Sequence, residues 1–504
     1  MTPTTIPALV RAAADAYGDR EYVVTPDRTL TFAEADERSA ELARRLLAVG
    51  IGKGTRVAMR FPQGPDWVVA FLALGRVGAL AVPLSTFLRP AELDRALRLA
   101  DADTFLVPDG SDGIDPGPSF RAALPYLRRV VGLGFQPAGA VPGDEVLREV
   151  EAEVRAADAL VMVQTSGATA EPKAVVHTHG AQVRHGRALA DLHGIDAGTR
   201  TFTTMPFFWV GGLTVTVLSH LHVGAAVLTV ESMHGPTIVD LLERARPTRL
   251  VGWTLMERLA GDPALAGRDI AWLDPLQLPN ARFPGRRHNS LGMTETSGPH
   301  TGAPVAANEA DLPAHLVGSF GPPLPDVEHR IVDPETGVVL PDGEEGEVCV
   351  RGYSVMDGLY KRERAEVFDA DGWYRTGDRG RFEHGVLFFG GRLADTIKTR
   401  GANVSPREVE AAAAARPDVA AAYVVGVPDA DAGEVVGCIV CPQPGDDVDL
   451  DALRAHLADE LSSYKVPKRF AVVPYDDVPR LPSGKVRAPD LVALLGGEAA
   501  VGPA

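Results

Sequence analysis

The chain has few cysteines, few aromatic residues, a deficit of positive charge and no long hydrophobic segment. Only 3 of its 504 residues are cysteine, so a framework of several disulfides is excluded. Lys and Arg number 50 against 67 Asp and Glu, which gives a net charge of −17. This charge argues against nucleic acid or an anionic membrane as the main partner. Any bound nucleotide must therefore be held by a few local cationic groups.

The most apolar window runs from Trp67 to Leu84 and is interrupted by Arg76. Turn residues follow it, so the pattern predicts a helix leading into a buried strand rather than a membrane span. The N-terminal residues lack the charged and apolar regions of a secretory signal. The expected location is therefore the cytoplasm.

Two of the three cysteines, Cys438 and Cys441, have the spacing of a redox pair or a zinc site. They lie in an alternating β pattern rather than at the start of a helix. Adjacent strand residues point to opposite faces, so side chains three positions apart point away from each other. We expect core cysteines here.

Strand and helix signals alternate over about the first 390 residues, which predicts an α/β architecture of layered sheets with parallel pairing. From Gly318 the pattern changes to shorter strands with frequent turns, such as Val327–Val332, as expected of a small β subdomain. After Gly391 a strand, a helix over Pro406–Ala415 and further strands indicate a separate α+β unit. The predicted domains are therefore residues 1–391 and a C-terminal lid of residues 392–504, with a hinge near Gly391–Asp395.

A polar loop from Gln164 to Lys173 lies between two apolar runs. Hydroxyl groups, backbone amides and one lysine on such a loop can surround phosphate oxygens. The loop is not a Walker motif, because Pro172-Lys173-Ala174 stands where Gly-Lys-Ser/Thr would be required. By itself it is also compatible with an ordinary surface turn. The candidate phosphate-binding residues are Thr165, Ser166, Gly167, Thr169 and Lys173.

Four later segments carry further hydroxyl, carboxylate and cationic groups of the kind that phosphoryl-transfer sites use. Such reactions build charge on phosphate oxygens, so hydroxyl donors, a lysine and Mg²⁺ must be prearranged. Taken singly, each segment has a plain structural alternative, such as a helix cap or a solvated turn. The segments are Gly292-Met293-Thr294-Glu295, Tyr374-Arg375-Thr376-Gly377-Asp378, Gly391 to Glu410, and Leu481-Pro482-Ser483-Gly484-Lys485-Val486-Arg487.

Together with the polar loop, these segments resemble the adenylate-forming superfamily in order and approximate spacing. That superfamily includes acyl-CoA synthetases, peptide-synthetase adenylation domains and luciferases. The resemblance covers nearly the full chain and implies a ligase that uses ATP and Mg²⁺, with CoA as the usual acceptor. It also implies a mobile C-terminal lid. The implied roles are Thr294 on the α-phosphate, Glu295 on Mg²⁺, Asp378 on the ribose, Arg392 on ribose or phosphate, and Lys173 and Lys485 as catalytic cations.

The chain departs from the superfamily pattern near the acceptor pocket and the lid. Trp209 stands where histidine is common, and Leu291 stands where a tyrosine commonly faces adenine. The phosphate loop has alanine at three positions where threonine or glycine is usual: Ala168, Ala170 and Ala174. The stretch 273–290 is also shorter than usual, either naturally or because residues are absent from the sequence. We interpret these departures to mean that the ATP chemistry is retained while the substrate differs.

The predicted function is adenylation of a small or aromatic carboxylic acid and its transfer to CoA or a carrier-protein thiol. One alternative keeps the fold but activates nitrite for reaction with an aryl amine. Another is a degenerate nucleotide-binding scaffold. A monomer or homodimer is expected. The residues assigned to the substrate pocket are Phe207, Phe208, Trp209, Gly211, Leu291 and Gly292.

Overall fold

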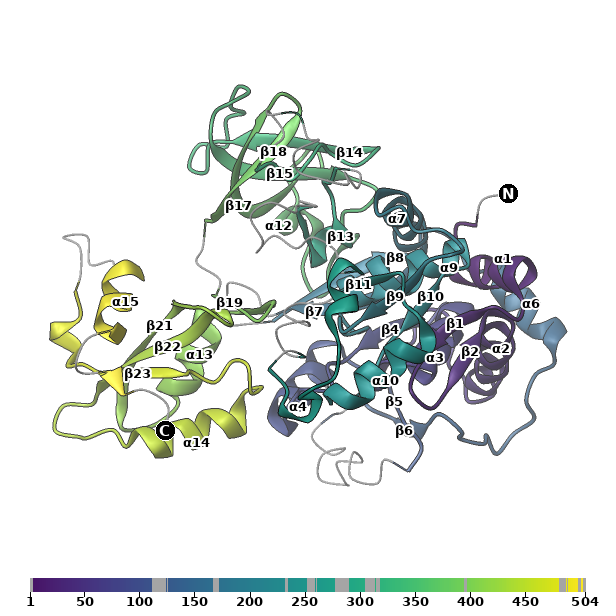
Figure 1. The fold of residues 1–504 in the computed structure, drawn as a ribbon, viewed down its shortest axis with the longest axis horizontal. Coiled ribbons are helices and arrows are strands. Elements are labelled where there is room, and N and C mark those ends of the chain that lie inside the picture. Colours follow the sequence, from purple (N-terminus) through teal and green to yellow (C-terminus); the bar gives the residue numbers. More distant parts are fainter. Residues whose placement is uncertain are drawn as a thin grey trace. The chain divides into compact units, whose positions relative to one another are not determined.

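The computed structural model divides the chain into two compact units (Figure 1). The first comprises Met1–Thr86, Leu97–Val163 and Ala174–Gly391, and the second comprises Phe87–Ala96, Gln164–Lys173 and Arg392–Ala504. The residues that the structure describes are 3–110, 124, 126–165, 172–231, 234–251, 259, 261–276, 290–303, 313, 318–393, 397–479, 486, 488–496 and 500–501.

A seven-stranded sheet forms one layer of the first unit, in the order β16-β8-β7-β4-β3-β5-β6. The pairs β3–β4, β3–β5, β4–β7 and β5–β6 are parallel. Parallel neighbours need crossover connections. Helices lie in the chain between β3 and β4, between β4 and β5, and between β6 and β7. The strands are β3 (Arg56–Met59), β4 (Leu80–Pro83), β5 (Thr104–Val107), β6 (Arg129–Gly132), β7 (Ala159–Thr165), β8 (Lys173–Thr178) and β16 (Gly358–Leu359), and the helices are α3 (Pro65–Arg76), α4 (Pro90–Leu99) and α6 (Asp144–Ala152).

A second, five-stranded sheet of the same unit has the order β11-β9-β10-β1-β2. Its pairs are parallel except for β1–β2, which is antiparallel. The strands are β1 (Glu21–Val24), β2 (Thr29–Thr31), β9 (Arg200–Thr203), β10 (Ala226–Leu228) and β11 (Arg249–Val251). The remaining helices of this part are α1 (Ile6–Tyr17), α2 (Phe32–Ala48), α7 (His179–Leu192), α8 (Val210–Gly212), a π-helical segment Leu213–Leu218, α9 (Ser219–Val223) and α10 (Gly235–Ala245).

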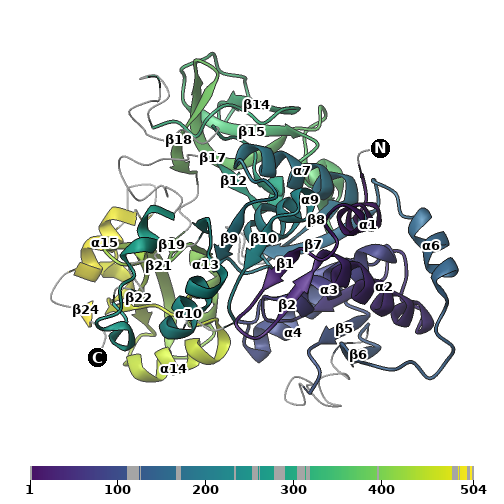
Figure 2. The same ribbon diagram turned by 45° about the vertical axis from the view of Figure 1, so that its right-hand side comes forward.

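The small β subdomain is a four-stranded sheet in the order β14-β15-β17-β18, whose strands lie side by side in Figure 2. The pairs β14–β15 and β15–β17 are antiparallel. Its elements are β14 (Val327–Val332), β15 (Gly346–Gly352), α12 (Arg364–Val367), β17 (Tyr374–Glu383) and β18 (Val386–Arg392). The predicted strand Val327–Val332 is therefore confirmed.

The C-terminal part of the second unit is built on a sheet in the order β20-β19-β22-β23-β24, with β21 paired to β22. Its strands are β19 (Ile397–Thr399), β20 (Ala402–Val404), β21 (Val419–Asp429), β22 (Gly433–Pro442), β23 (Arg469–Val472) and β24 (Ala500–Val501). Its helices are α13 (Pro406–Ala414), α14 (Leu450–Glu460) and α15 (Ala488–Gly496). The helix predicted over Pro406–Ala415 thus ends one residue earlier.

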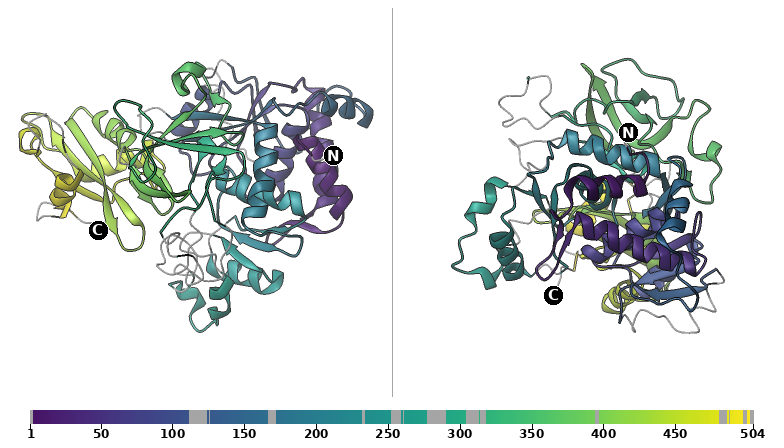
Figure 3. Two further views of the ribbon diagram at one scale, coloured as in Figure 1. Left: turned by 90° about the horizontal axis from the view of Figure 1, so that it is seen from above. Right: turned by 90° about the vertical axis from the view of Figure 1, so that its right-hand side faces the viewer.

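Helix α2 begins with a capping box. Thr31 Oγ1 accepts a hydrogen bond from the Glu34 backbone N–H at 3.1 Å, and Glu34 Oε2 accepts from the Thr31 N–H at 2.8 Å. This reciprocal pair satisfies two amides that a helix start leaves without partners. The helix then packs against α1 and α3, and the purple helices near the N-terminus lie side by side in Figure 3.

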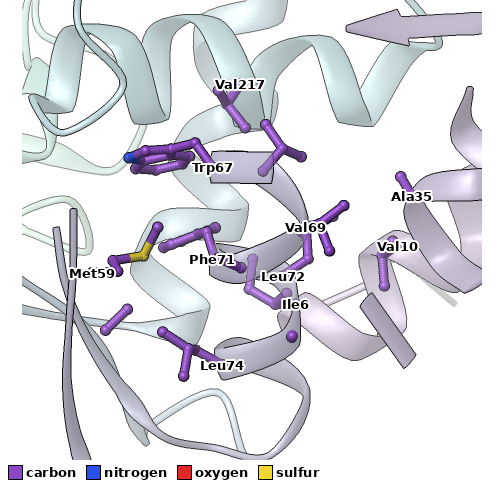
Figure 4. Packing of buried hydrophobic residues seen from close by; sticks show 14 of the residues in the cluster. Ile6, Val10, Ala35, Met59, Trp67, Val69, Phe71, Leu72, Leu74 and Val217 are labelled. Atoms are coloured by element: carbon purple, nitrogen blue, oxygen red, sulfur yellow. The ribbon is translucent and has the colours of Figure 1, made fainter. Parts of the chain in front are cut away.

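Helix α3 is buried along almost its whole circumference, as expected of a central helix. Figure 4 shows Trp67, Phe71 and Leu72 of this helix among apolar neighbours that include Met59 and Val217.

The last residue of α3, Arg76, is fully buried but paired. Its guanidinium contacts Glu151 at 2.5 Å, donates to Ser39 Oγ at 2.9 Å and also binds Asp36. A buried arginine requires such partners because an unpaired charge would be strongly destabilising.

The cysteine prediction is confirmed. Cys438 and Cys441 are both buried thiols in β22 and lie in different hydrophobic clusters. Their side chains thus point to opposite faces of the strand, where neither a shared zinc ion nor a disulfide would fit. Among the described residues, no helix combines the length and the apolar character that crossing a membrane requires.

Candidate functional site

Thr294 and Glu295 lie at the tip of a short antiparallel hairpin made of β12 (Gly292–Met293) and β13 (Gly298–Pro299). A single 3₁₀ turn, Thr294–Thr296, connects the two strands. The hairpin is tight at Gly292, where an added Cβ would lie 2.4 Å from the carbonyl carbon of Gly298. The glycine of the motif therefore permits the close approach that forms the turn.

Three separate segments hold this turn in place. Nε2 of His177, on β8, lies 2.7 Å from the carbonyl oxygen of Thr294. The Met356 N–H donates to the Glu295 carbonyl oxygen at 2.8 Å. The Tyr374 hydroxyl donates to Glu295 Oε1 at 3.2 Å, and the Glu295 residue is only 7% exposed. Both the backbone and the side-chain carboxylate of Glu295 are thus held by hydrogen bonds.

Strand β17 carries Tyr374 and Asp378 on the same buried face, since burial alternates along it. A bulge interrupts its pairing with β15, because Glu347 pairs with Arg379 while Cys349 pairs with Arg375. Bulges of this kind redirect side chains next to functional sites.

The bulge is stabilised by side chains. Gly377 has φ +71 and donates its N–H to Glu347 Oε1 at 3.0 Å. Thr376 Oγ1 donates to the Val348 carbonyl oxygen at 2.7 Å and accepts from the Asp378 N–H at 3.0 Å. Asp378 is thereby presented as a carboxylate that is only 2% exposed.

The structure joins Tyr374 to Glu295 by a hydrogen bond, and Asp378 lies four residues after Tyr374 on the same strand. Thr294 directly precedes Glu295 in the turn. Thr165 ends β7 and Lys173 begins β8, and these strands are neighbours in the seven-stranded sheet. The other predicted loop residues, Ser166, Gly167 and Thr169, lie outside the described residues, as does Lys485. Arg392 ends β18.

The residues assigned to the substrate pocket have different environments. Phe207 is fully buried, and its ring packs edge-on against Trp67 with centroids 5.6 Å apart. Phe208 packs against the partly exposed Trp209, also with centroids 5.6 Å apart. A Cβ on Gly211 would lie 2.1 Å from Met205 Cε, so the end of this flexible side chain would have to move to admit one.

Leu291 and Gly292 complete the predicted pocket set. Leu291 is 9% exposed and belongs to a hydrophobic cluster with Leu189 and Leu192 of α7. Gly292 is exposed at the start of the hairpin. The assignment of this set to a substrate pocket stays a prediction.

The polar residues behind the hairpin, above all His177 and Ser297, were not predicted from the sequence. A signal was present, because His177 interrupts the apolar run Val175-Val176 of a buried strand. A polar side chain in such a strand must be hydrogen-bonded.

Comparison with known proteins assigns the family. A sequence profile described as "AMP-binding enzyme" matches residues 10–360, and one for the C-terminal domain of such enzymes matches residues 408–485. The chain belongs to the AMP-binding enzyme family. This AMP-binding enzyme is 31% identical to sulfoacetate–CoA ligase from Cupriavidus necator, over 96% of each chain. It is also 31% identical to indoleacetate–CoA ligase from Aromatoleum aromaticum, over 93% of this chain and 94% of that one.

Among solved structures, a double mutant of o-succinylbenzoate CoA synthetase from Bacillus subtilis, bound to a product analogue, has a similar fold. Its TM-score is 0.78 at 25% identity, over 96% of this chain and 98% of that one. The adenylate-forming resemblance and the α/β fold class are therefore confirmed. The AMP-binding enzyme described here is an ATP-dependent, AMP-forming ligase. These relatives support neither the nitrite-dependent alternative nor the scaffold alternative.

Proposed function

We propose that this AMP-binding enzyme adenylates a small or aromatic carboxylic acid and transfers the acyl group to the thiol of CoA. The observation that best supports this proposal is the contact between the Thr294–Glu295 turn and strand β17. Tyr374 of that strand binds Glu295, and the same strand carries Asp378. The named relatives act on acids of both kinds, sulfoacetate and indoleacetate. Trp209 beside Phe208 favours a pocket for a short or flat acid.

The first step joins the acid to AMP. A carboxylate oxygen of the acid attacks the α-phosphorus of ATP, the bond from that phosphorus to the β-phosphate oxygen breaks, and pyrophosphate leaves. The Thr294 hydroxyl donates to an α-phosphate oxygen, and the cations of Lys173 and Lys485 offset the growing negative charge. Asp378 accepts hydrogen bonds from the ribose hydroxyls, and Arg392 binds ribose or phosphate.

The second step releases AMP. The CoA thiolate attacks the acyl carbon, and the bond between that carbon and the phosphate oxygen breaks. The proposed division into residues 1–391 and a lid of residues 392–504 assigns Lys485 and Arg392 to the part that moves between the steps.

The residues fit a magnesium ion that is held mainly by substrate. Among the described residues, no cluster of three or more His, Cys, Asp or Glu side chains could hold a metal. Mg²⁺ commonly uses one or two carboxylates together with phosphate oxygens and water, and Glu295 supplies such a carboxylate. The bound ion would neutralise phosphate charge.

The test is ATP–pyrophosphate exchange with a panel of short and aromatic acids, followed by thioester formation with CoA. We expect exchange with at least one acid and no need for CoA in that half-reaction. Glu295→Gln should lower exchange on the order of 100-fold, because the metal loses its charged ligand. The matched variant Glu328→Gln changes an exposed carboxylate of β14 and should behave as the parent.

If the parent enzyme shows no ATP–pyrophosphate exchange with any acid of the panel, adenylation of this substrate class is refuted. Exchange without thioester formation would refute CoA as the acceptor and direct the search to a carrier-protein thiol.

A further inference from the structure

A line of five buried or half-buried polar residues lies directly behind the Thr294–Glu295 turn. It starts at Thr214, in the π-helical segment, and passes through Gln182 of α7 to Ser297 and His177. The last contact joins His177 to the backbone of Thr294. Thr214, Gln182, Ser297 and His177 are all 0% exposed. Since water does not reach them, these groups must satisfy one another.

The direction of the last hydrogen bond is fixed by chemistry. The Thr294 carbonyl oxygen can only accept, so Nε2 of His177, at 2.7 Å, must carry a proton and donate. Complete burial lowers the pKa of His177 to about 4, against a smaller opposing effect of this hydrogen bond. The ring is therefore neutral at ordinary pH, and Nδ1 carries a lone pair.

The preceding bonds follow from a neutral ring. The Ser297 hydroxyl lies 2.9 Å from His177 Nδ1, to which it donates, and the Ser354 carbonyl oxygen is a second, longer acceptor at 3.2 Å. Gln182 Nε2 donates to Ser297 Oγ at 3.0 Å. Thr214 Oγ1 donates to Gln182 Oε1 at 2.8 Å. Reversing the Gln182 amide would require the single Ser297 proton to turn towards Gln182, leaving His177 Nδ1 without a donor.

Hydrogen bonds aligned in one direction polarise and strengthen one another. The chain ends on the carbonyl that directly precedes Glu295, and the Ser297 N–H donates to the same oxygen at 3.1 Å. The carbonyl of Thr294 is thus held from two sides, and with it the orientation of the peptide that carries Glu295.

We propose that His177 is a positioning residue for adenylation, acting through the Thr294 carbonyl to set the placement of Glu295. The inference rests on the proposed function, in which Glu295 is a magnesium ligand. The ring reaches neither substrate nor metal in this role. Instead it transmits the rigidity of α7 and the π-helical segment to the turn, where a misplacement of about 1 Å can cost about 100-fold in rate.

Three substitutions of His177 distinguish the contribution of its Nδ1 contact from that of its Nε2 contact. His177→Phe keeps the ring but removes both polar contacts. His177→Asn keeps a polar atom near Nδ1 and loses the reach to Thr294. His177→Gln places an amide N–H near Nε2 and should restore the contact to Thr294. A matched control is His222→Phe, because His222 Nε2 also lies 2.7 Å from a backbone carbonyl, that of Val183, and burial likewise lowers its pKa to about 4.

The measurements are ATP–pyrophosphate exchange as a function of Mg²⁺, calorimetric titration of the full chain with MgATP, and the unfolding midpoint. We expect His177→Phe and His177→Asn to lower exchange about tenfold or more, to raise the half-saturating Mg²⁺ concentration, and to weaken MgATP binding. His177→Gln should recover most of each quantity. His222→Phe should lower only the unfolding midpoint.

The inference is overturned if folded His177→Phe keeps the parent's Mg²⁺ dependence and MgATP affinity, or if His222→Phe shifts them equally. Should His177→Phe fail to fold, Ser297→Gly serves instead, because Ser297 has φ +61, which glycine adopts readily. A parent-like Mg²⁺ curve for Ser297→Gly would also overturn it. By contrast, if the parent enzyme shows no exchange with any acid, the proposed function itself is wrong.

Discussion

At the scale of single residues, Asp378 is the buried carboxylate that we propose as the ribose ligand. Its exposed fraction is 2%, and the bulge at Gly377 determines where it lies in β17. A buried carboxylate is costly to desolvate, so its position is informative about what it binds. In the proposed site it accepts hydrogen bonds from both ribose hydroxyls.

Asp378→Asn should raise the KM for ATP about 10- to 100-fold with a smaller change in kcat, because charge-assisted hydrogen bonds contribute about 1.5–3 kcal/mol each. Steady-state exchange kinetics with varied ATP measure this. The exposed Asp371→Asn, in the same subdomain, is the control. An unchanged KM for Asp378→Asn would remove Asp378 from the ATP site.

At the scale of elements, the buried guanidinium of Arg76 joins α3 to its neighbours. Asp36 and Ser39 belong to α2, and Glu151 belongs to α6. Removing one partner of a buried ion pair is strongly destabilising, whereas exposed pairs contribute little.

Arg76→Met should therefore lower the free energy of unfolding of the first unit by about 3–5 kcal/mol. Arg28→Met loses ion pairs with Asp27, Asp66 and Glu231, but the arginine side chain is 41% exposed, so the change should cost at most about 1 kcal/mol. Urea unfolding followed by tryptophan fluorescence is suited to this, since all five tryptophans precede residue 391. Equal effects of the two variants would contradict the structural role given to Arg76.

Local patterns predicted many elements but not those that depend on packing. The pattern of short strands between turns predicted β14 at Val327–Val332, and the start of α13 was predicted at Pro406. The π-helical segment Leu213–Leu218 was not predicted, because its hydrogen-bond pattern is set by the residues packed around it. The residues around the candidate site divide in the same way. Motif spacing predicts a role for Glu295, whereas Gln182 and Ser297 meet only through the fold.

At the scale of the whole molecule, buried histidines couple folding to pH. Burial is the main cause of a lowered pKa in each of them. The pKa values are about 4 for His177, His179, His222 and His329, and about 3 for His185 and His220. Between pH 6.5 and pH 4 the unfolded chain binds protons at these positions and the folded chain does not. Stability is thus highest above pH 6.5 and is lost as pH falls through this window.

The urea concentration at the midpoint of unfolding should accordingly fall steeply as the pH is lowered from 7 to 4.5. His222→Phe should reduce the slope of unfolding free energy against pH by up to about 1.4 kcal/mol per pH unit, because one site of proton uptake is removed. His384→Gln, whose parent side chain is 68% exposed, should leave the slope unchanged. A midpoint that is flat over this range would contradict the burial of neutral histidines.

The burial of every cysteine has a practical consequence for the assay. The three thiols are inaccessible, and burial raises the pKa of Cys349 to about 11 and that of Cys438 above its usual range. Because the thiolate is the reactive form, chromogenic thiol reagents should leave the folded protein unlabelled. Consumption of free CoA can then be read optically against a low background, and colour that develops before CoA is added would report denatured material.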